Sequence, residues 1–256
     1  EKIIELPACA LFMEMGLGKT VSTLTAINEL IYDRFEVQKV LVIAPYRVAD
    51  DTWTTEADKW DHLKHLRVSK VLGTSGERIA ALEADADIYV INRENVTWLV
   101  NLTGKEWPFE MIVVDELSSF KSNSAKRFKS LRIVRPLARR FVGLTGTPAP
   151  NGLLDLWPQV YLIDRGERLG KTYTGYKDRY FLPDRRNGFV VYSWTPKEGA
   201  KEAIEQKLSD ICISMKADDY LNLPAQIVND VYVSMDRHEM RKYRELEKEK
   251  LLELDG

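Results

Sequence analysis

The sequence Met15-Gly-Leu-Gly-Lys-Thr20 decides the fold of this chain. It follows an apolar run, Ala8 to Met13, and precedes a segment, Val21 to Ile31, whose apolar residues recur at the spacing of one helix face. A strand, a glycine-containing turn and a helix therefore follow one another. The backbone N–H groups of such a turn and of the helix N-terminus form a concave anion site. We expect a nucleoside triphosphate there, with Lys19 on the outer phosphates and the Thr20 hydroxyl on Mg²⁺.

This loop departs from the general phosphate-binding pattern at one position. The pattern GxxxxGK[ST] begins with a glycine, where this chain has Met13. Gly-Lys-Thr alone is a weak signal, because a surface turn can carry it by chance. The strand before it and the amphipathic helix after it favour a nucleotide site over a surface turn.

The composition describes a globular protein of 256 residues with a net charge of −2. Such a length holds one large domain, or one domain and part of another. No apolar run approaches the roughly 20 residues that cross a bilayer, so we expect a cytoplasmic protein without a membrane partner.

The slightly acidic net charge means that any nucleic acid must bind a local basic patch. The chain starts without a methionine and stops just after a charged helical pattern, so we expect it to be part of something longer.

Short apolar strands alternate with helical segments over the first 150 residues. This alternation predicts an α/β fold with three layers: a parallel sheet of the P-loop NTPase kind with helices on both faces. Further strands are expected at Lys39–Ala44, Arg67–Leu72, Asp87–Ile91, Glu110–Val114 and Arg140–Thr145, and helices at Ala49–Trp60 and Ser75–Glu83.

Beyond Asn151 the regular alternation fades. A stretch rich in Gly, Tyr, Arg and Asp, residues 164–192, predicts an insertion outside the sheet. The remaining expected elements are helices at Leu153–Ile163, Pro196–Leu208 and Arg237–Leu254, and strands at Asp210–Met215 and Gln226–Met235.

Two acids, Asp115 and Glu116, directly follow one of the apolar strands. In open α/β sheets ligands gather at the carboxyl ends of the strands, so these acids are expected beside the nucleotide. This is the place of a Walker B pair. Asp115 would hold Mg²⁺ together with Thr20, and Glu116 would orient or deprotonate an attacking water. The alternative is a pair of ordinary surface acids, which the nearby Gly-Lys-Thr sequence makes the weaker interpretation.

The next strand ends in Thr145-Gly146-Thr147-Pro148. Its two hydroxyl groups could sense the terminal phosphate or the acids, so we expect Thr145, Gly146 and Thr147 to couple the nucleotide state to another part of the molecule. The alternative is a simple turn, in which Gly, Thr and Pro are all common.

A basic segment without any acid extends from Leu117 to Leu154. If residues 124–135 form a helix, Phe128, Leu131 and Val134 share one side and Lys126, Lys129 and Arg132 lie roughly opposite. A charged face of one sign beside an ATP site suits a phosphate backbone, although a solvated face is the simpler interpretation. The eight cations are Lys121, Lys126, Arg127, Lys129, Arg132, Arg135, Arg139 and Arg140. From this segment we take Lys121, Lys126, Arg127 and Lys129 as candidate DNA contacts.

Five stretches together resemble the Swi/Snf-type branch of the superfamily-two helicases. Leu11–Thr20 resembles motif I, Val42–Trp60 the motif Ia region, Ile91–Glu94 the segment Ile-Thr-Thr-Tyr-Glu, Asp115–Ser118 motif II and Leu144–Asn151 motif III. The family commonly has Ala-Asp where this chain has Phe-Met before Glu14, and Ala-His where it has Leu-Ser after Glu116. The resemblance covers residues 11–156. Its nucleotide-binding residues would be Glu14, Met15, Gly16, Leu17, Gly18, Lys19 and Thr20.

This resemblance implies a RecA-like lobe of an ATP-driven motor that tracks the backbone of double-stranded DNA without reading bases. It places Pro45, Tyr46, Arg47, Asn92 and Arg93 on the DNA side. Such motors bind ATP and Mg²⁺ between this lobe and a second RecA-like lobe, which supplies arginine fingers. The motifs of that second lobe are absent from this sequence. The implied organisation is a first lobe at 1–224, with a helical protrusion at about 153–208, and a connection toward the second lobe at 225–256.

Three other functions remain open from the residues. A nucleotide-dependent module could bind DNA or a protein without motor activity. A GTPase would need Asn-Lys-x-Asp, of which Met215-Lys216-Ala217-Asp218 is a near miss. A helicase that separates strands of RNA is also compatible with the motifs alone.

Overall fold

The computed structural model describes residues 1–184, 186–187, 190–191, 193–215 and 236–254. The chain divides into two compact units, Glu1–Tyr220 and Leu221–Gly256. In the second unit the described element is one charged helix, α11 (Arg237–Leu254), at the predicted position. The predicted strand at residues 226–235 lies outside the described residues.

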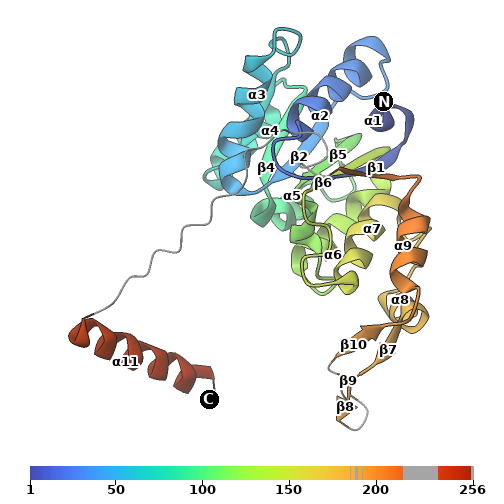
Figure 1. Ribbon diagram of the computed structural model, residues 1–256. Helices are drawn as coiled ribbons and strands as arrows, with labels where there is room; N and C mark the ends of the chain where they lie inside the picture. Colours follow the sequence, from blue (N-terminus) through green and yellow to red (C-terminus); the bar gives the residue numbers. More distant parts are fainter. Residues whose placement is uncertain (185, 188–189, 192, 216–235, 255–256) are drawn as a thin grey trace, which may run out of the picture. The chain divides into compact units, whose positions relative to one another are not determined.

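A parallel sheet forms the centre of the first unit (Figure 1). Within the described residues it has seven strands in the order β11-β1-β6-β5-β2-β4-β3. All neighbouring strands run parallel. The strands are β1 (Ala8–Met13), β2 (Val40–Ala44), β3 (Val68–Val71), β4 (Ile88–Asn92), β5 (Met111–Asp115), β6 (Arg140–Thr145) and β11 (Cys212–Met215). These bounds agree within two residues with the strands expected there, which confirms the predicted α/β class.

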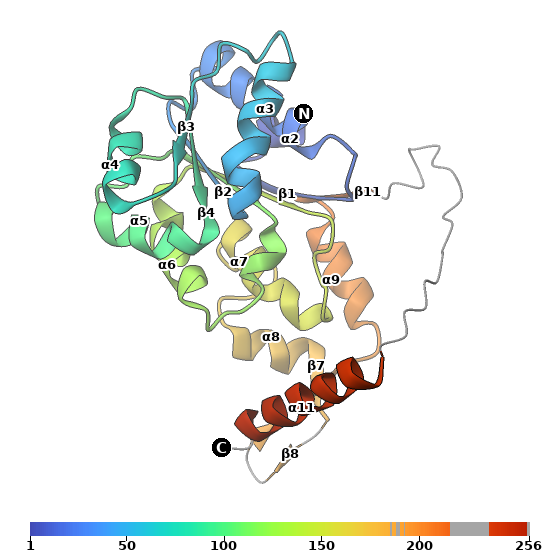
Figure 2. The ribbon, with the colours of Figure 1, turned by 90° about the vertical axis from the view of Figure 1, so that its left-hand side faces the viewer.

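Helices cover both faces of this sheet (Figures 1 and 2). One core cluster joins the sheet to α2 (Lys19–Asn28) and α3 (Trp53–Lys59), and the other joins it to α5, α6, α7 and α9. The remaining helices are α1 (Lys2–Glu5), α4 (Ser75–Glu83), α5 (Val96–Thr103), α6 (Lys126–Val134), α7 (Leu156–Asp164), α8 (Tyr173–Tyr180) and α9 (Ala200–Leu208). Two π-helical turns adjoin these helices. The turn η1 (Glu29–Asp33) follows α2 directly, and η2 (Val48–Thr52) directly precedes α3.

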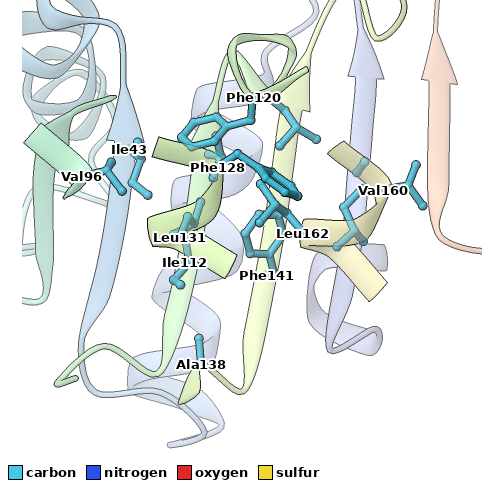
Figure 3. Packing of buried hydrophobic residues seen from close by; sticks show 14 of the residues in the cluster. Ile43, Val96, Ile112, Phe120, Phe128, Leu131, Ala138, Phe141, Val160 and Leu162 are labelled. Carbon is cyan, nitrogen blue, oxygen red and sulfur yellow. The ribbon is translucent and has the colours of Figure 1, made fainter. Parts of the chain in front are cut away.

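The core explains why the apolar runs become strands buried on both faces. Every residue of β2 and β4 is buried, as expected for a parallel sheet between two helical layers. Figure 3 shows Phe128 and Leu131 of α6 packed beside Ile112 of β5 and Phe141 of β6. The predicted division of α6 is confirmed, because Phe128, Leu131 and Val134 are buried while Lys126 and Lys129 are exposed.

The chain between residues 153 and 208 has two kinds of structure. Helices α7 and α9 bury apolar side chains in the sheet's core cluster, among them Val160 and Ile204. Between them, α8 leads into a small antiparallel pair, β7 (Phe181–Pro183) with β10 (Trp194–Pro196), outside the main sheet. The assignment of a helical protrusion to this range stays a prediction, and the packing of α7 and α9 shows which parts belong to the layered core.

The cations of the basic segment do not all lie on the surface. Two of the eight, Arg135 and Arg140, are buried and serve the fold. The Arg140 guanidinium donates to the carbonyl oxygens of Ile3, Ile4 and Leu6, and it pairs with Glu36 at 2.7 Å. These acceptors lie more than 100 positions away, so no local pattern could have revealed them.

The Arg135 side chain caps the C-terminal end of α7. Its guanidinium donates to the carbonyl oxygens of Leu162 at 2.5 Å, Ile163 at 2.7 Å and Ala138 at 3.0 Å. Burial lowers the pKa of Arg135 to about 10. The side chain satisfies helix-end carbonyls that would otherwise be buried without donors.

Replacement of Arg135 by methionine should destabilise the first unit. Methionine fills similar space but donates no hydrogen bond, so the free energy of unfolding should fall by about 1–3 kcal/mol. Arg139→Met, on an exposed side chain four positions away, is the matched control and should change it by less than about 0.5 kcal/mol. Urea unfolding followed by circular dichroism measures both. Equal stabilities for the two variants would contradict the structural role of Arg135.

None of the helices in the described parts of the chain is long and apolar enough to cross a membrane.

Candidate nucleotide site

The phosphate loop connects β1 to α2 at the carboxyl edge of the sheet. Gly16 and Gly18 have φ of 82° and 71°, a conformation that other residues adopt at a cost, and Gly18 immediately precedes α2. The Thr23 hydroxyl donates to the carbonyl of Lys19 at 2.7 Å and fixes the first turn of the helix. The predicted order of strand, turn and helix is confirmed.

Lys19 lies inside the bend of this loop. Its ammonium Nζ donates to the carbonyl oxygens of Met13 at 2.7 Å and Glu14 at 2.9 Å. Burial lowers the pKa of Lys19, whereas the nearby charges of Asp115 and Glu116 raise it. Met13 is the last residue of β1 and is buried in the core, so the position that departs from the general pattern belongs to the strand and contributes its carbonyl to the loop.

The sheet brings the two acids to the same edge as the loop. Strand β6 lies between β1 and β5; Phe12 is in register with Thr145, and Leu144 is in register with Asp115. The Asp115 carboxylate accepts a hydrogen bond from Trp53 Nε1 at 3.1 Å. Burial raises the pKa of Asp115, and the Trp53 hydrogen bond acts in the opposite direction.

Glu116 has a constrained backbone and a hydrogen-bonded carboxylate. Its φ of 60° and ψ of 58° are left-handed values, which are uncommon for a residue other than glycine and often occur at functional sites. Its Oε1 accepts from Ser118 Oγ at 2.5 Å and from Thr145 Oγ1 at 3.2 Å. The Thr147 N–H in turn donates to Thr145 Oγ1 at 3.1 Å. The predicted coupling segment therefore contacts the second acid directly.

Gly146 links that segment to the phosphate loop. A Cβ placed on it would meet the Met13 carbonyl oxygen at 3.4 Å and Glu14 Cα at 3.5 Å. The ends of β6 and β1 are thus in close backbone contact, although the coupling roles of Thr145, Gly146 and Thr147 stay predictions.

The site offers donors that suit Mg²⁺. A hydroxyl from Thr20 and a carboxylate from Asp115 are the hard oxygen ligands that this ion takes in nucleotide sites. Asp115 is half-buried and the loss of solvent around its carboxylate raises its pKa, so a bound cation would compensate its negative charge. These residues fit the ion, and their assignment as ligands remains a prediction.

A pocket of about 480 Å³ opens beside the phosphate loop. Its second wall comes from η2, α3 and the residue after α3, a contribution that sequence reasoning missed. No spacing signal indicates that α3 lies beside α2, but the structure places the two helices in contact. In the turn after α3, His62 Nε2 lies 2.9 Å from Thr25 Oγ1 of α2. The lining residues are Met15, Gly16, Gly18, Lys19, Thr20, Val21, Thr52, Glu56, Lys59 and Trp60.

The candidate DNA-side loops lie next to each other. Strands β2 and β4 are neighbours, with Ala44 in register with Asn92, so the loop Pro45–Arg47 and Arg93 emerge side by side. Tyr46 is 55% exposed and Arg47 is exposed. Asn92 is buried: its amide donates to Glu94 and its carbonyl accepts from Asn95. These hydrogen bonds indicate that Asn92 stabilises the loop after β4.

The candidate cations near α6 differ in accessibility. Lys126 and Lys129 are exposed, and Arg127 is half-buried with an Nε that has no hydrogen-bond partner. Lys121 is also half-buried, and its Nζ lies 3.9 Å from the Asp155 carboxylate. DNA contact by these side chains stays a prediction.

The fold and the site together define a P-loop NTPase with a RecA-like lobe. The SNF2-related domain matches residues 5–256, and the chain belongs to this family. The Swi/Snf-type resemblance of the five motifs is thereby confirmed.

Relatives and a solved structure agree with this family. The chain is 38% identical over 258 residues to protein p41 of Acyrthosiphon pisum secondary endosymbiont phage 1, covering 98% of the chain and 56% of p41. It is 28% identical over 233 residues to the bovine DNA annealing helicase and endonuclease ZRANB3, covering 86% of the chain and 20% of that protein. The Sulfolobus solfataricus SWI2/SNF2 ATPase core in complex with dsDNA matches with a TM-score of 0.65 and 25% identity, covering 82% and 40% of the two chains. The chain thus spans only part of its relatives and corresponds to part of an ATPase core.

Proposed function

We propose that this chain is the ATP-binding lobe of a DNA-dependent ATPase that translocates on or remodels double-stranded DNA through backbone contacts. The observation that carries the proposal is the shared edge of the sheet. The nucleotide residues follow β1, β5 and β6, while the DNA-side candidates follow the next strands, β2 and β4. ATP and DNA would therefore bind at adjacent positions on one rigid layer.

The residues of the site take separate roles in hydrolysis. The loop N–H groups and the Lys19 ammonium bind the phosphates, and Thr20 and Asp115 would hold Mg²⁺. When bound, this ion neutralises charge on the phosphates. Glu116 orients the attacking water and accepts its proton. Because Thr145 donates to Glu116, a shift at the end of β6 would alter the carboxylate that handles the water.

A second RecA-like lobe would complete the site. An arginine finger is typically worth about 10³–10⁵ in rate, so this chain alone should bind ATP and hydrolyse it slowly. The solved structural match is a SWI2/SNF2 ATPase core bound to dsDNA, which supports DNA as the activating partner. The GTPase alternative has less support, because Met215 replaces the asparagine that would read guanine and the solved structural match is an ATPase core.

The proposal is tested by ATP turnover of this chain and of a version carrying a second lobe, each with and without duplex DNA. The two-lobed version should respond to duplex DNA of any sequence, and this chain alone should turn over ATP slowly. Equal rates from both versions, or a response to RNA alone, would contradict the proposal. Binding of DNA without any hydrolysis by the two-lobed version would favour a nucleotide-dependent binding module.

A further inference from the structure

Trp53 makes a hydrogen bond from a distant part of the chain to the predicted metal ligand. It is the first residue of α3, its side chain is 0% exposed, and its indole Nε1 donates to Asp115 Oδ2 at 3.1 Å. The two residues are 62 positions apart in the sequence. The sequence predicted a helix and a resemblance to motif Ia for the segment containing Trp53, but no contact between Trp53 and Asp115.

The hydrogen bond restricts how the Asp115 carboxylate can turn. A terminal carboxylate rotates over a broad range, so a ligand that must meet a cation gains from a partner on one oxygen. The indole cannot follow such rotation, because Trp53 is packed in the core cluster of α2, α3 and the sheet. The Glu116 backbone also donates a hydrogen bond to this carboxylate. With Oδ2 held by the indole, the direction of Oδ1 is fixed by the same carboxylate plane.

We propose that Trp53 is a positioning residue that holds Asp115 in the orientation required for Mg²⁺. The inference rests on the proposed function only through the assignment of Asp115 as a metal ligand, and it does not depend on DNA. Outer partners of this kind typically change metal affinity by about 10–100-fold when they are removed. A side chain that only filled space in the core would leave the Mg²⁺ requirement unchanged.

Trp53→Phe tests the proposal, because phenylalanine retains an aromatic ring and lacks the N–H. Binding of a fluorescent ATP analogue is titrated first in EDTA and then at increasing Mg²⁺. In EDTA the variant should bind the analogue as tightly as the unmodified protein does. The Mg²⁺ concentration that gives half of the gain in affinity should be at least about 10-fold higher for the variant. The readout is binding, so it requires no turnover.

The chain contains a matched control in Trp157. This residue is 2% exposed, and its Nε1 donates to the Gly170 carbonyl at 3.0 Å in the core cluster on the other face of the sheet. Trp157→Phe removes a similar hydrogen bond from a similar environment, and it should leave the Mg²⁺ dependence unchanged. Identical Mg²⁺ dependence in the two variants would overturn the positioning role.

Asp115→Asn separates a failure of this inference from a failure of the metal assignment. If Asp115 ligates Mg²⁺, Asp115→Asn should remove most of the Mg²⁺-dependent gain, and adding Trp53→Phe to it should have little further effect. Retention of the full gain in Asp115→Asn would refute the ligand assignment itself. Loss of the gain in Asp115→Asn but not in Trp53→Phe would refute only the role of Trp53.

If Trp53→Phe does not fold, NMR of the indole N–H groups tests the proposal without any change at Trp53. In protein with ¹⁵N-labelled indoles, Mg²⁺ added to the ATP-bound protein should shift one indole resonance. Asp115→Asn should move that same resonance in the free protein and abolish its response to Mg²⁺. The absence of any indole signal sensitive to both changes would overturn the proposal.

Discussion

Changing Glu116 to glutamine is expected to lower DNA-stimulated ATP hydrolysis by about 10²–10⁴-fold, the usual contribution of a general base. Glutamine keeps the length of the side chain and an oxygen that can accept from Thr145 and Ser118. It cannot take a proton from water. The loss should therefore appear in kcat, while the affinity for ATP and Mg²⁺ changes little.

Steady-state turnover of the two-lobed protein with duplex DNA measures this effect, and nucleotide binding is titrated in parallel. Glu83→Gln, on an exposed residue at the end of α4, is the charge-matched control and should keep full activity. Hydrolysis by Glu116→Gln within tenfold of the unmodified protein would mean that another group handles the water. In that case the bond between Glu116 and Thr145 would have only a structural role.

Sequence reasoning predicted those parts of the fold in which local pattern and tertiary packing agree. Continuous apolar runs such as Val40–Ala44 have few alternatives to a strand buried on both faces. The ends of these strands then locate Lys19, Asp115 and Glu116, because parallel strands present their carboxyl ends at one edge. The helix α5 was not predicted. Its residue Asn95 provides no side-chain cap, and the apolar side chains Val96, Leu99 and Val100 follow a strand almost directly.

The side-chain contacts that sequence reasoning missed depend on partners far away in the chain. Arg135 was counted among the cations of the basic segment, but two of its acceptors are carbonyls at the end of α7, 27 and 28 positions later. Trp53 and Asp115 meet only because β2 and β5 are neighbours in the sheet. A single sequence carries the periodicity of each element and does not specify which elements will lie side by side.

Neutralising the three cations Lys126, Arg127 and Lys129 with glutamine is expected to weaken binding to duplex DNA equally for all sequences. A side chain that contacts a phosphate releases a counterion on binding, so each lost contact lowers the slope of log affinity against log salt by about 0.9. Three lost contacts would lower it by about 2.7, and the loss of affinity would be greatest at low salt. ATP turnover at saturating DNA should be nearly unchanged, because none of the three side chains lines the nucleotide pocket.

The control for this prediction must remove the same charge from another edge of the sheet. Lys39, Lys64 and Lys105 are exposed and lie in the connections that lead into β2, β3 and β5, at the edge opposite the nucleotide site. Their replacement by glutamine changes the net charge equally but should leave the salt slope within about one unit of the unmodified value. If both triple variants bind DNA alike, the three cations of α6 form an ordinary solvated face. The DNA surface would then be confined to the loops after β2 and β4, where Tyr46 and Arg47 are exposed.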